Sequence, residues 1–519
     1  MTKDTIVILD FGSQYTQLIT RCVREQSVYS LQLPWSTTAE TISNIQPAGI
    51  ILSGGPASIY SRNAPKFPPY LLTLQFPLLG ICYGMQAMAD ALDGEITPST
   101  AREFGYTQLT VKTPNPLIPA GGHQVWMSHG DQITKLPSGF SQLAATDNTP
   151  LAAMGDLDRK FFGVQFHPEV KHTSIGNNII RNFLFQICNI SPTWTPASII
   201  DESITKIKNE IGNAKVLSAV SGGVDSSVAT ALVHKAVGNQ LDAVFVDTGL
   251  LRQNEAQCVR SALQENLHIN LKTVSAADQY FQDLKGIIDP EEKRTRIGNR
   301  FIRIFEEEAR NLDNPEFLVQ GTIYPDVVES AAADRPESET IKTHHNVGGL
   351  PENMSFRLIE PLRYLFKDEV RKIGEELGLP RFLVWRQPFP GPGLAIRCLG
   401  EVTPERVDRL READAIYLEV LEEENLLHYN KDDGIHGSSQ AFAVLLPVKA
   451  VGVMGDQRTY EDVIALRAVT TDDFMTADWA RFPAEILARI SNRIVNEVKG
   501  INRVVYDITS KPPGTIEWE

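Results

Sequence analysis

The sequence predicts an α/β protein of three domains, namely residues 1–193, 194–388 and 389–519. We expect a mostly parallel sheet in the first, a doubly wound parallel sheet in the second and a smaller α+β fold in the third. Three observations lead to this prediction. The chain has 519 residues, and a domain has roughly 150. Short apolar runs alternate with helical patterns. A stretch with two prolines near residue 190 and a stretch rich in proline and glycine near residue 390 interrupt this pattern, as is typical of boundaries.

The composition is that of a globular protein, with 42% hydrophobic and 22% charged residues. The formal net charge of −15 argues against a broad nucleic-acid-binding surface, although it allows a local basic site for a small phosphate. We therefore expect no nucleic-acid partner.

The cysteines and the apolar runs indicate a cytoplasmic protein without a membrane partner. The chain has five cysteines, an odd number, and no C-x-x-C pair, so neither a disulfide framework nor a zinc site is expected. The first apolar run stops at Asp10, which is too early for a signal peptide. The longest apolar stretch, residues 441–455, contains Pro447 and Lys449, so no transmembrane helix is expected.

In the first domain, strand-like runs are expected at Ile6–Leu9, Gly49–Leu52 and Pro77–Ile81. The first and third are each followed by a turn and a helical pattern, ending near Glu25 and Leu92. This alternation predicts a mostly parallel sheet.

A cysteine follows the third run in the pattern G-x-C-x-G, from Gly80 to Gly84. This pattern has the shape of a nucleophile elbow with Cys82 in place of serine. The flanking glycines permit a strained turn, and the N-terminus of the following helix favours the thiolate. The alternative is a buried structural cysteine, which is the commoner fate of a lone cysteine.

A thiol nucleophile needs a base, and residues 161–170 end a strand-like run with His167-Pro168-Glu169. An imidazole with a carboxylate two residues later can supply a base and the group that orients it. Taken alone, His167 is better explained as a surface histidine in a proline turn.

Together with Cys82 and the loop Ser53-Gly54-Gly55-Pro56, this pair resembles the class I glutamine amidotransferases. The resemblance implies that Cys82 attacks the glutamine amide, that His167 takes and returns the proton, and that Glu169 orients His167.

The same resemblance implies further site residues. Backbone N–H groups near Gly55 and Tyr83 would hold the oxyanion. Gln86 and residues 128–131 would help to bind glutamine. The product would be ammonia.

A second motif follows a linker at residues 188–197 and a helix expected at Ser198–Ile211. The apolar run Lys215–Val220 leads into a loop of small residues, a helix is expected from about Val228, and Asp242–Asp247 is the next strand. Small residues and a helix N-terminus favour phosphate. The loop lacks the Walker A lysine, and the alternative is a turn that merely caps a helix. Its residues are Ser221, Gly222, Gly223, Val224, Asp225, Ser226 and Ser227.

This loop resembles the pyrophosphate-binding loop of the ATP pyrophosphatases, which cleave ATP between its α and β phosphates. An acidic residue in a phosphate-binding loop makes sense if Mg²⁺ accompanies the nucleotide, with Asp225 near the ion. By resemblance, the backbone of Val244–Gly249 would face the adenine.

Later in this domain, strands are expected at Phe317–Gly321 and Arg357–Pro361 and a helix at Lys367–Leu377. Two stretches are rich in ligand-type residues. Residues 342–351 include Lys342 and two histidines; a mobile loop that closes over the nucleotide is favoured over a metal site. Residues 289–296 fit a solvated helix start, although by resemblance Arg294 would contact the substrate nucleotide.

The third domain follows a rigid boundary at residues 386–395. We expect helices at about Pro404–Glu423 and Ala484–Val498. Strands are expected at Ala441–Val453, Ile464–Val469 and Arg503–Ile508. The apolar, partly alternating sheet suits a homodimer face.

The chain ends in KPPGTIEWE, which is either a floppy terminus or a segment in which Lys511 and Glu517 complete a nucleotide site. In order along the chain, the two loop motifs, IKTHHNVGGLP, FPGPGLAIR and this tail resemble the glutamine-hydrolysing GMP synthetases from end to end. The resemblance implies that ATP with Mg²⁺ adenylates the C2 oxygen of xanthosine 5′-monophosphate (XMP). Ammonia from glutamine then displaces AMP.

Three other readings are weaker. A different glutamine-fed ATP pyrophosphatase, forming NAD or argininosuccinate, lacks support from the carboxy-terminal motifs. A tRNA-thiolating enzyme is disfavoured by the acidic charge and the missing C-x-x-C. A nucleotide-sensing regulatory protein with inactive catalytic sites is disfavoured, because such a protein would not have to keep Cys82, His167 and Glu169.

Overall fold

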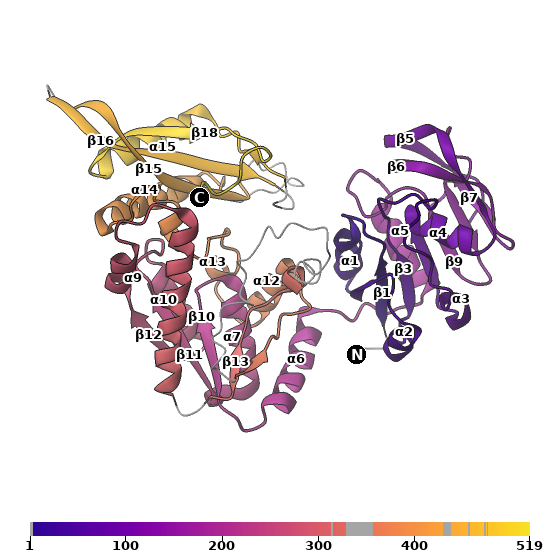
Figure 1. The fold of residues 1–519 in the computed structure, drawn as a ribbon, viewed down its shortest axis with the longest axis horizontal. Helices are drawn as coiled ribbons and strands as arrows, with labels where there is room; N and C mark the ends of the chain where they lie inside the picture. The colour runs from indigo at the N-terminus through magenta and orange to yellow at the C-terminus, as the bar shows by residue number, and fades with distance from the viewer. Residues whose placement is uncertain are drawn as a thin grey trace. The chain divides into compact units, whose positions relative to one another are not determined.

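The computed structural model describes residues 4–312, 315–327, 356–428, 437–454, 457–471, 474 and 476–519. Lys342 and the predicted closing loop at residues 342–351 lie outside these ranges. The chain divides into two compact units, Met1–Ser198 and Ile199–Glu519 (Figure 1).

The first unit is built on a nine-stranded sheet in the order β2-β1-β3-β4-β9-β8-β7-β5-β6. The first five strands in this order are parallel, and the other four are antiparallel. The strands are β1 (Thr5–Asp10), β2 (Tyr29–Pro34), β3 (Gly49–Leu52), β4 (Leu78–Ile81), β5 (Glu95–Val111), β6 (Gly122–Lys135), β7 (Ser141–Ala145), β8 (Ala153–Asp156) and β9 (Phe161–Val164). The helices are α1 (Thr16–Glu25), α2 (Ala39–Ile45), α3 (Leu71–Leu74), α4 (Tyr83–Ala91) and α5 (Gly176–Asn182).

The parallel strands are apolar on both faces because each face supports its own core. Ile6 and Ile8 of β1 belong to one buried cluster, which includes residues of α1 and α5. Val7 and Leu9 belong to a second cluster, which includes residues of α2 and α4. Successive side chains of a strand point to opposite faces, so the continuous apolar run is the signature of a sheet covered on both sides.

The second unit begins with a five-stranded parallel sheet in the order β12-β11-β10-β13-β14. Its strands are β10 (Val216–Val220), β11 (Leu241–Asp247), β12 (Asn270–Ser275), β13 (Phe317–Val319) and β14 (Arg357–Ile359). Its helices are α6 (Pro196–Ile211), α7 (Val224–Val237), α8 (Glu255–Arg260), α9 (Ala277–Leu284), α10 (Pro290–Arg310), α12 (Lys367–Glu376) and α13 (Arg381–Val384).

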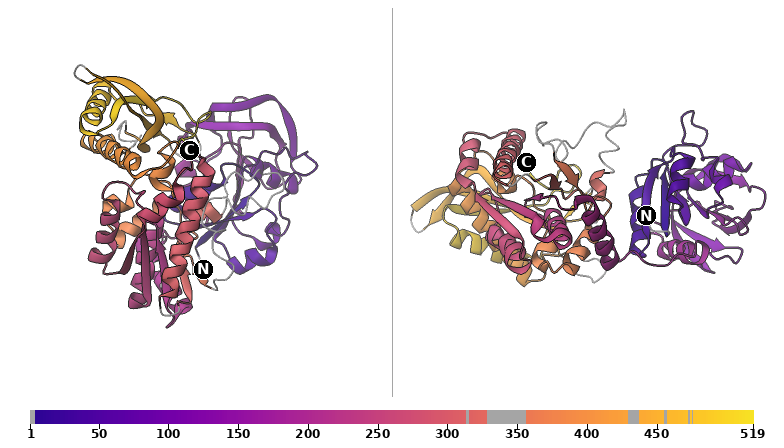
Figure 2. Two further views of the ribbon diagram at one scale, coloured as in Figure 1. Left: turned by 60° about the vertical axis from the view of Figure 1, so that its left-hand side comes forward. Right: turned by 90° about the horizontal axis from the view of Figure 1, so that it is seen from below.

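Helices cover both faces of this parallel sheet (Figure 2). Leu217 packs in a cluster with residues of α10, whereas the neighbouring Ser218 bonds through its hydroxyl to Thr230 of α7 at 2.8 Å. The strand order reverses at β10, with β11 on one side and β13 on the other. Ligands of open α/β sheets bind at the carboxyl ends of strands at such a switch point, and the loop at residues 221–223 follows β10 there.

The chain ends in a four-stranded sheet of β15 (Gln440–Met454), β16 (Gln457–Thr470), β17 (Asp478–Trp479) and β18 (Ile501–Asp507). Helices α14 (Pro404–Glu423) and α15 (Ala484–Glu497) pack against this sheet and against each other (Figure 1). One hydrophobic cluster contains residues of both sheets of the unit. The predicted boundary at residue 388/389 therefore separates two sheets that share a core.

Two local features differ from the sequence-based expectation. The antiparallel strands β5–β8 have no counterpart in the predicted parallel sheet. Helix α7 begins at Val224, one turn before the expected Val228, and Gly223 is its N-cap. Residues 224–227 of the small-residue loop therefore form the first turn of this helix. No helix among the described residues is long and apolar enough to span a membrane.

Candidate active sites in the two units

Cys82 lies in the sharp turn between β4 and α4, with φ 49° and ψ −106°. Positive φ is strained for a residue with a side chain. Glycines on either side let the turn pack closely: a Cβ at Gly80 would lie 2.6 Å from the Met85 nitrogen, and one at Gly84 would lie 2.4 Å from the Leu52 oxygen. The G-x-C-x-G pattern is thus a nucleophile-elbow turn, with the thiol presented at the N-terminus of α4.

His167 and Glu169 follow β9, the strand beside β4, and both are buried. The His167 Nδ1 lies 2.7 Å from Glu169 Oε1. Burial disfavours the imidazolium, but the Glu169 carboxylate and the hydrogen bond to Cys82 outweigh it and raise the pKa of His167 to about 11. The histidine is therefore protonated at neutral pH, with its imidazolium in hydrogen-bond contact with the Cys82 side chain.

The loop at residues 53–56 packs against this pair. A Cβ at Gly54 would lie 3.3 Å from His167 Cε1, and one at Gly55 would lie 2.8 Å from the Phe11 oxygen and 3.4 Å from Tyr83 Cγ. Tyr83 is the first residue of α4, so its backbone N–H has no acceptor within the helix. The structure thus brings together the Gly55 and Tyr83 regions, from which the predicted oxyanion donors come.

Gln86 is buried beneath the elbow. Its Nε2 donates to the Asp131 carbonyl oxygen at 2.8 Å and to Gln165 Oε1 at 3.1 Å. Gln165 Nε2 in turn lies 3.5 Å from Cys82 Sγ. The sequence analysis did not identify Gln165. Its position two residues before His167 was the one feature of the sequence that pointed to it.

Residues 128–131 reach the same site from β6. Cys82 Sγ lies 3.6 Å from the Ser128 carbonyl oxygen. His129 is buried, with its Nδ1 3.0 Å from the Asp131 carbonyl oxygen. Burial lowers the pKa of His129, so this second histidine is neutral and its role is structural.

The small-residue loop forms a compact turn at the switch point of the second unit. Gly222 has φ 79°, which glycine adopts freely. The Ser221 and Ser226 hydroxyls lie 3.0 Å apart, and Ser227 Oγ donates to the Gly223 carbonyl oxygen at 2.8 Å. A Cβ at Gly321 would lie 3.0 Å from Ser226 N, so the end of β13 closes the other side of the turn.

Two cations that sequence reasoning missed lie beside this loop. Lys367 Nζ is 2.5 Å from Asp225 Oδ2, and Arg386 Nη1 donates to the Gly222 carbonyl oxygen at 2.6 Å. Lys367 is the first residue of α12, where a cation opposes the helix dipole. A lysine at this unfavourable position indicates that its side chain pairs with an acidic group elsewhere in the fold.

Asp225 also fits a magnesium ion. Its Oδ1 is buried and has no hydrogen-bond partner in the described part of the chain. Mg²⁺ usually takes one or two carboxylates and completes its shell with phosphate oxygens and water. The described residues form no cluster of three or more acidic, histidine or cysteine ligands.

The C-terminal tail folds back onto the second unit. Arg397, which is fully buried, holds Glu517 through two bonds, Nε to Oε2 at 3.0 Å and Nη2 to Oε1 at 2.7 Å. Gln440 Nε2 donates to the same Oε1 at 2.8 Å. The predicted alternative of a floppy terminus is therefore wrong for this segment.

Two residues of α10 hold the last residue of the chain. Arg294 Nη2 donates to the Glu519 main-chain oxygen at 2.6 Å, and the fully buried Lys293 lies 2.6 Å from Glu519 Oε2. Arg294 and Glu517 thus lie in one tail-binding region. Lys511 Nζ donates to the Phe474 carbonyl oxygen at 2.7 Å.

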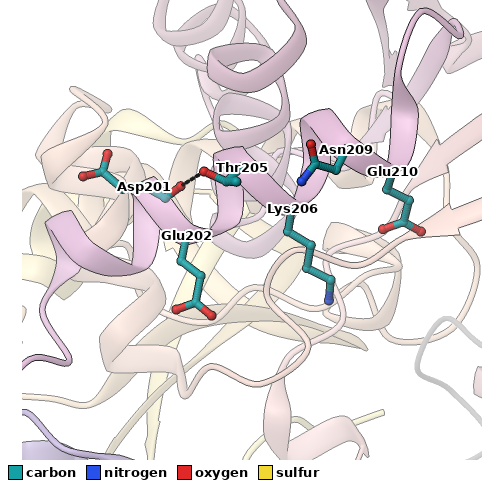
Figure 3. A pocket seen from close by; sticks show the side chains of 6 residues that line it. All are labelled: Asp201, Glu202, Thr205, Lys206, Asn209 and Glu210. Atoms are coloured by element: carbon teal, nitrogen blue, oxygen red, sulfur yellow. Dashed lines mark hydrogen bonds between the residues drawn. The ribbon is translucent and has the colours of Figure 1, made fainter. Parts of the chain in front are cut away.

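A hollow on α6 is a third candidate, and it lacks the features of a site (Figure 3). It is lined by one face of this single helix, with Asp201, Glu202, Thr205, Lys206, Asn209 and Glu210. Thr205 Oγ1 donates to the Asp201 carbonyl oxygen at 2.9 Å, an ordinary bond within the helix. Three of the lining side chains are acidic and one is basic.

Three known families match successive parts of the chain. Residues 7–187 match the class-I glutamine amidotransferase family, residues 197–306 match the NAD synthase family, and residues 428–518 match the GMP synthase C-terminal domain.

Curated relatives match along the whole chain, and each is named GMP synthase [glutamine-hydrolyzing]. The protein of Thermosynechococcus vestitus is 53% identical and aligns with 100% of this chain and 97% of its own length. That of Clostridium botulinum is 53% identical over 100% of both chains. That of Carboxydothermus hydrogenoformans is 54% identical over 99% of both.

Proposed function

Because this chain belongs to the family of glutamine-hydrolysing GMP synthases, we propose that it converts XMP to GMP. ATP adenylates the C2 oxygen of XMP, glutamine supplies ammonia, and ammonia displaces AMP. The products are GMP, AMP, pyrophosphate and glutamate. The reaction is that of a carbon–nitrogen ligase with glutamine as the amido donor.

The observation that carries this proposal is a match along the full length, and not to one domain. The amidotransferase and NAD synthase families together would suit any glutamine-fed ATP pyrophosphatase. Residues 428–518 remove that ambiguity, because they match the C-terminal domain of GMP synthases. The tail that folds back in this domain is the segment in which Lys511 and Glu517 would complete a nucleotide site, one of the two alternatives that the sequence left open.

In the first unit, the geometry supports hydrolysis of the glutamine amide at Cys82. The thiolate attacks the amide carbon, and N–H groups near Gly55 and Tyr83 hold the oxyanion that forms. His167 gives its proton to the departing ammonia, and Glu169 fixes the ring through the 2.7 Å bond to Nδ1. A water then releases glutamate from the thioester, with His167 as the base.

In the second unit, residues 221–227 hold the phosphates that leave as pyrophosphate. The Ser221 and Ser226 hydroxyls and the N-terminus of α7 supply donors, and Lys367 supplies charge. Lys367 Nζ lies 2.5 Å from Asp225 Oδ2. Nucleotide phosphates would draw Lys367 away and leave the carboxylate for a cation.

Magnesium would be held at Asp225 together with the nucleotide, where it neutralises phosphate charge. The orphaned Oδ1 atom supports this assignment. XMP would be bound by Arg294, Lys511 and Glu517, with Lys342 from the segment outside the described residues. The pairing of Glu517 with Arg397 supports an ordered tail in this role.

A homodimer through the C-terminal sheet is the oligomeric state we propose. Val451 and Val453 of β15 are 52% and 74% exposed, and Tyr460, which pairs with Val451 across the hairpin, is 64% exposed. These three side chains form an exposed apolar patch of the kind that marks a protein interface. A cytoplasmic location is supported by the five cysteines, all of which are free thiols.

The test is a single reaction of pure protein with ATP, Mg²⁺, XMP and glutamine, in which GMP, AMP and pyrophosphate are followed together. We expect the three to form in equal amounts. AMP and pyrophosphate without GMP would mean that the acceptor or the nitrogen supply is misassigned. ADP in place of AMP would contradict the proposed cleavage of ATP.

A further inference from the structure

We propose that Gln165 is a catalytic residue of the glutaminase, one that donates a hydrogen bond to the Cys82 thiolate. We also propose that Gln86 is a positioning residue that holds the Gln165 amide in the required orientation. The proposal rests on the function assigned above to the first unit. This positioning role of Gln86 would act alongside the glutamine binding that the sequence predicted.

The surroundings of the Cys82 sulfur call for a donor. Its Sγ lies 3.6 Å from the Ser128 carbonyl oxygen. That oxygen can accept the proton of a thiol, but its partial negative charge repels a thiolate. The Gln165 amide nitrogen lies 3.5 Å from the same sulfur. An N–H group there stabilises the thiolate more than the thiol, because hydrogen bonds to a charged acceptor are the stronger kind.

The orientation of the Gln165 amide follows from its neighbours. The Asp131 carbonyl oxygen can only accept a hydrogen bond, so the Gln86 atom 2.8 Å away is the amide nitrogen. The same nitrogen lies 3.1 Å from the Gln165 amide, which must therefore present its oxygen to Gln86. The remaining end of the Gln165 amide, facing the sulfur, is the NH₂ group.

Burial makes this orientation robust. Gln165 has no exposed surface, and Gln86 is 4% exposed. If the Gln165 amide were reversed, two NH₂ groups would face each other and the amide oxygen would face the sulfur. Leaving buried donors unsatisfied is costly. The Asp131 carbonyl oxygen thus fixes the orientation of the Gln86 amide, and Gln86 fixes that of the Gln165 amide beside Cys82.

The resulting site stabilises the thiolate from two sides. The His167 imidazolium supplies a full charge and the proton that ammonia needs. Gln165 supplies a neutral donor that stays in place when His167 has given up its proton. It therefore continues to stabilise sulfur as the leaving group when water cleaves the thioester, a step in which the C–S bond breaks and sulfur departs as thiolate.

The main test is Gln165→Glu, which keeps the length of the side chain and the acceptor for Gln86 but turns an oxygen toward the sulfur. We expect kcat for glutamine hydrolysis to fall about 100-fold, with little change in KM for glutamine. We also expect alkylation of Cys82 by iodoacetamide, followed by peptide mass spectrometry, to require higher pH. Gln142→Glu is the matched control, because Gln142 lies on β7 and donates to the Pro150 carbonyl oxygen at 2.5 Å on the surface.

A double-mutant cycle tests the positioning role. Gln86→Met should lower kcat about 10-fold, and adding it to Gln165→Glu should cause no further loss, because the amide that Gln86 orients is already gone. Additive losses would contradict the positioning role. Should Gln165→Glu not fold, Gln165→Met removes the donor without a charge and carries the same expectation.

The outcomes separate this proposal from the proposed function. An unchanged alkylation profile, or a rise in KM alone, in Gln165→Glu would overturn the proposal and indicate a contact with glutamine instead. Normal GMP synthesis from ammonium by the variant would show that the second unit is intact. Failure of the wild-type protein to aminate XMP would contradict the proposed function, and the alkylation result would still decide the role of Gln165.

Discussion

The glutaminase site and the phosphate loop lie at the carboxyl ends of parallel strands, but they treat charge in opposite ways. In the first, His167 and Glu169 are buried and pair with each other, 2.7 Å apart. In the second, the paired side chains of Asp225 and Lys367 are 29% and 42% exposed. The first site keeps its charges in a buried pair, whereas the second keeps them in a pair that is partly open to solvent.

This difference follows from the two chemistries. A covalent nucleophile needs a fixed base, a fixed oxyanion site and little water. A loop that binds phosphate and a cation must leave its donors and its carboxylate accessible. Substitutions should therefore affect the two sites in different ways, the first through kcat and pH dependence and the second through nucleotide affinity.

The largest effect is expected at the phosphate loop. Asp225→Ala should lower AMP and pyrophosphate formation by about 1,000-fold or more, because both the cation ligand and the partner of Lys367 are lost. Release of glutamate in the absence of nucleotide should stay at the wild-type level. A parallel loss of that basal glutamate release would contradict the separation of the two sites.

A somewhat smaller effect is expected for Glu169→Gln. The amide keeps the bond to His167 but removes the charge that raises the pKa of His167 to about 11. We expect kcat for glutamine hydrolysis to fall about 100-fold and its alkaline limit to move to lower pH. A pH–rate profile from pH 6 to 11 measures both, and an unmoved alkaline limit would contradict the role given to Glu169.

The same pair links stability to pH. The folded-state pKa of His167 lies above its ordinary value of 6.5, so the stabilisation is complete below pH 6.5 and is lost as the pH rises toward about 11. The melting temperature of the wild-type protein should therefore fall across this range more than that of His167→Asn. Equal slopes for the two proteins would show that the pair does not stabilise the fold.

A moderate effect is expected for Glu517→Gln in the tail. Arg397 would keep its place but lose a charged partner, and we expect KM for XMP to rise about 10-fold. The glutaminase activity of the first unit should be unchanged. A KM for XMP equal to that of the wild type would mean that the tail has a structural role only.

The smallest effect on catalysis is expected for Val451→Glu on the exposed face of β15. A charge in an apolar interface disfavours association, so sedimentation should show a monomer where the wild type is a dimer. Ala450→Glu is the matched control, because Ala450 is the neighbouring position and its side chain points to the other face. Identical sedimentation of the wild type and the Val451→Glu variant would contradict the proposed interface.

The sequence predicted local features better than distant contacts. Cys82 was recognisable because the constraint is local: glycines two residues on either side allow the strained turn. The phosphate loop was recognisable for the same reason. Lys367 was missed because its partner Asp225 lies 142 residues away, and no local pattern encodes that pairing.

The same limit applies elsewhere. Gln165 was missed because its function depends on Gln86 and Cys82, which come from another strand–helix connection. Strands β5 and β6 were missed because half-buried antiparallel strands lack the continuous apolar runs of parallel ones. The tail was left with two alternatives because its order comes from Arg397 and Lys293, two fully buried cations whose partners, Glu517 and Glu519, lie at the end of the chain.

The most direct test of this division of labour is the Cys82→Ala variant, assayed for GMP once with glutamine and once with ammonium as the nitrogen source. The account predicts no GMP from glutamine and a wild-type rate from ammonium, because the second unit needs only the ammonia that Cys82 releases. An equal loss with both nitrogen sources would show that the two sites are not separate, and would contradict the account.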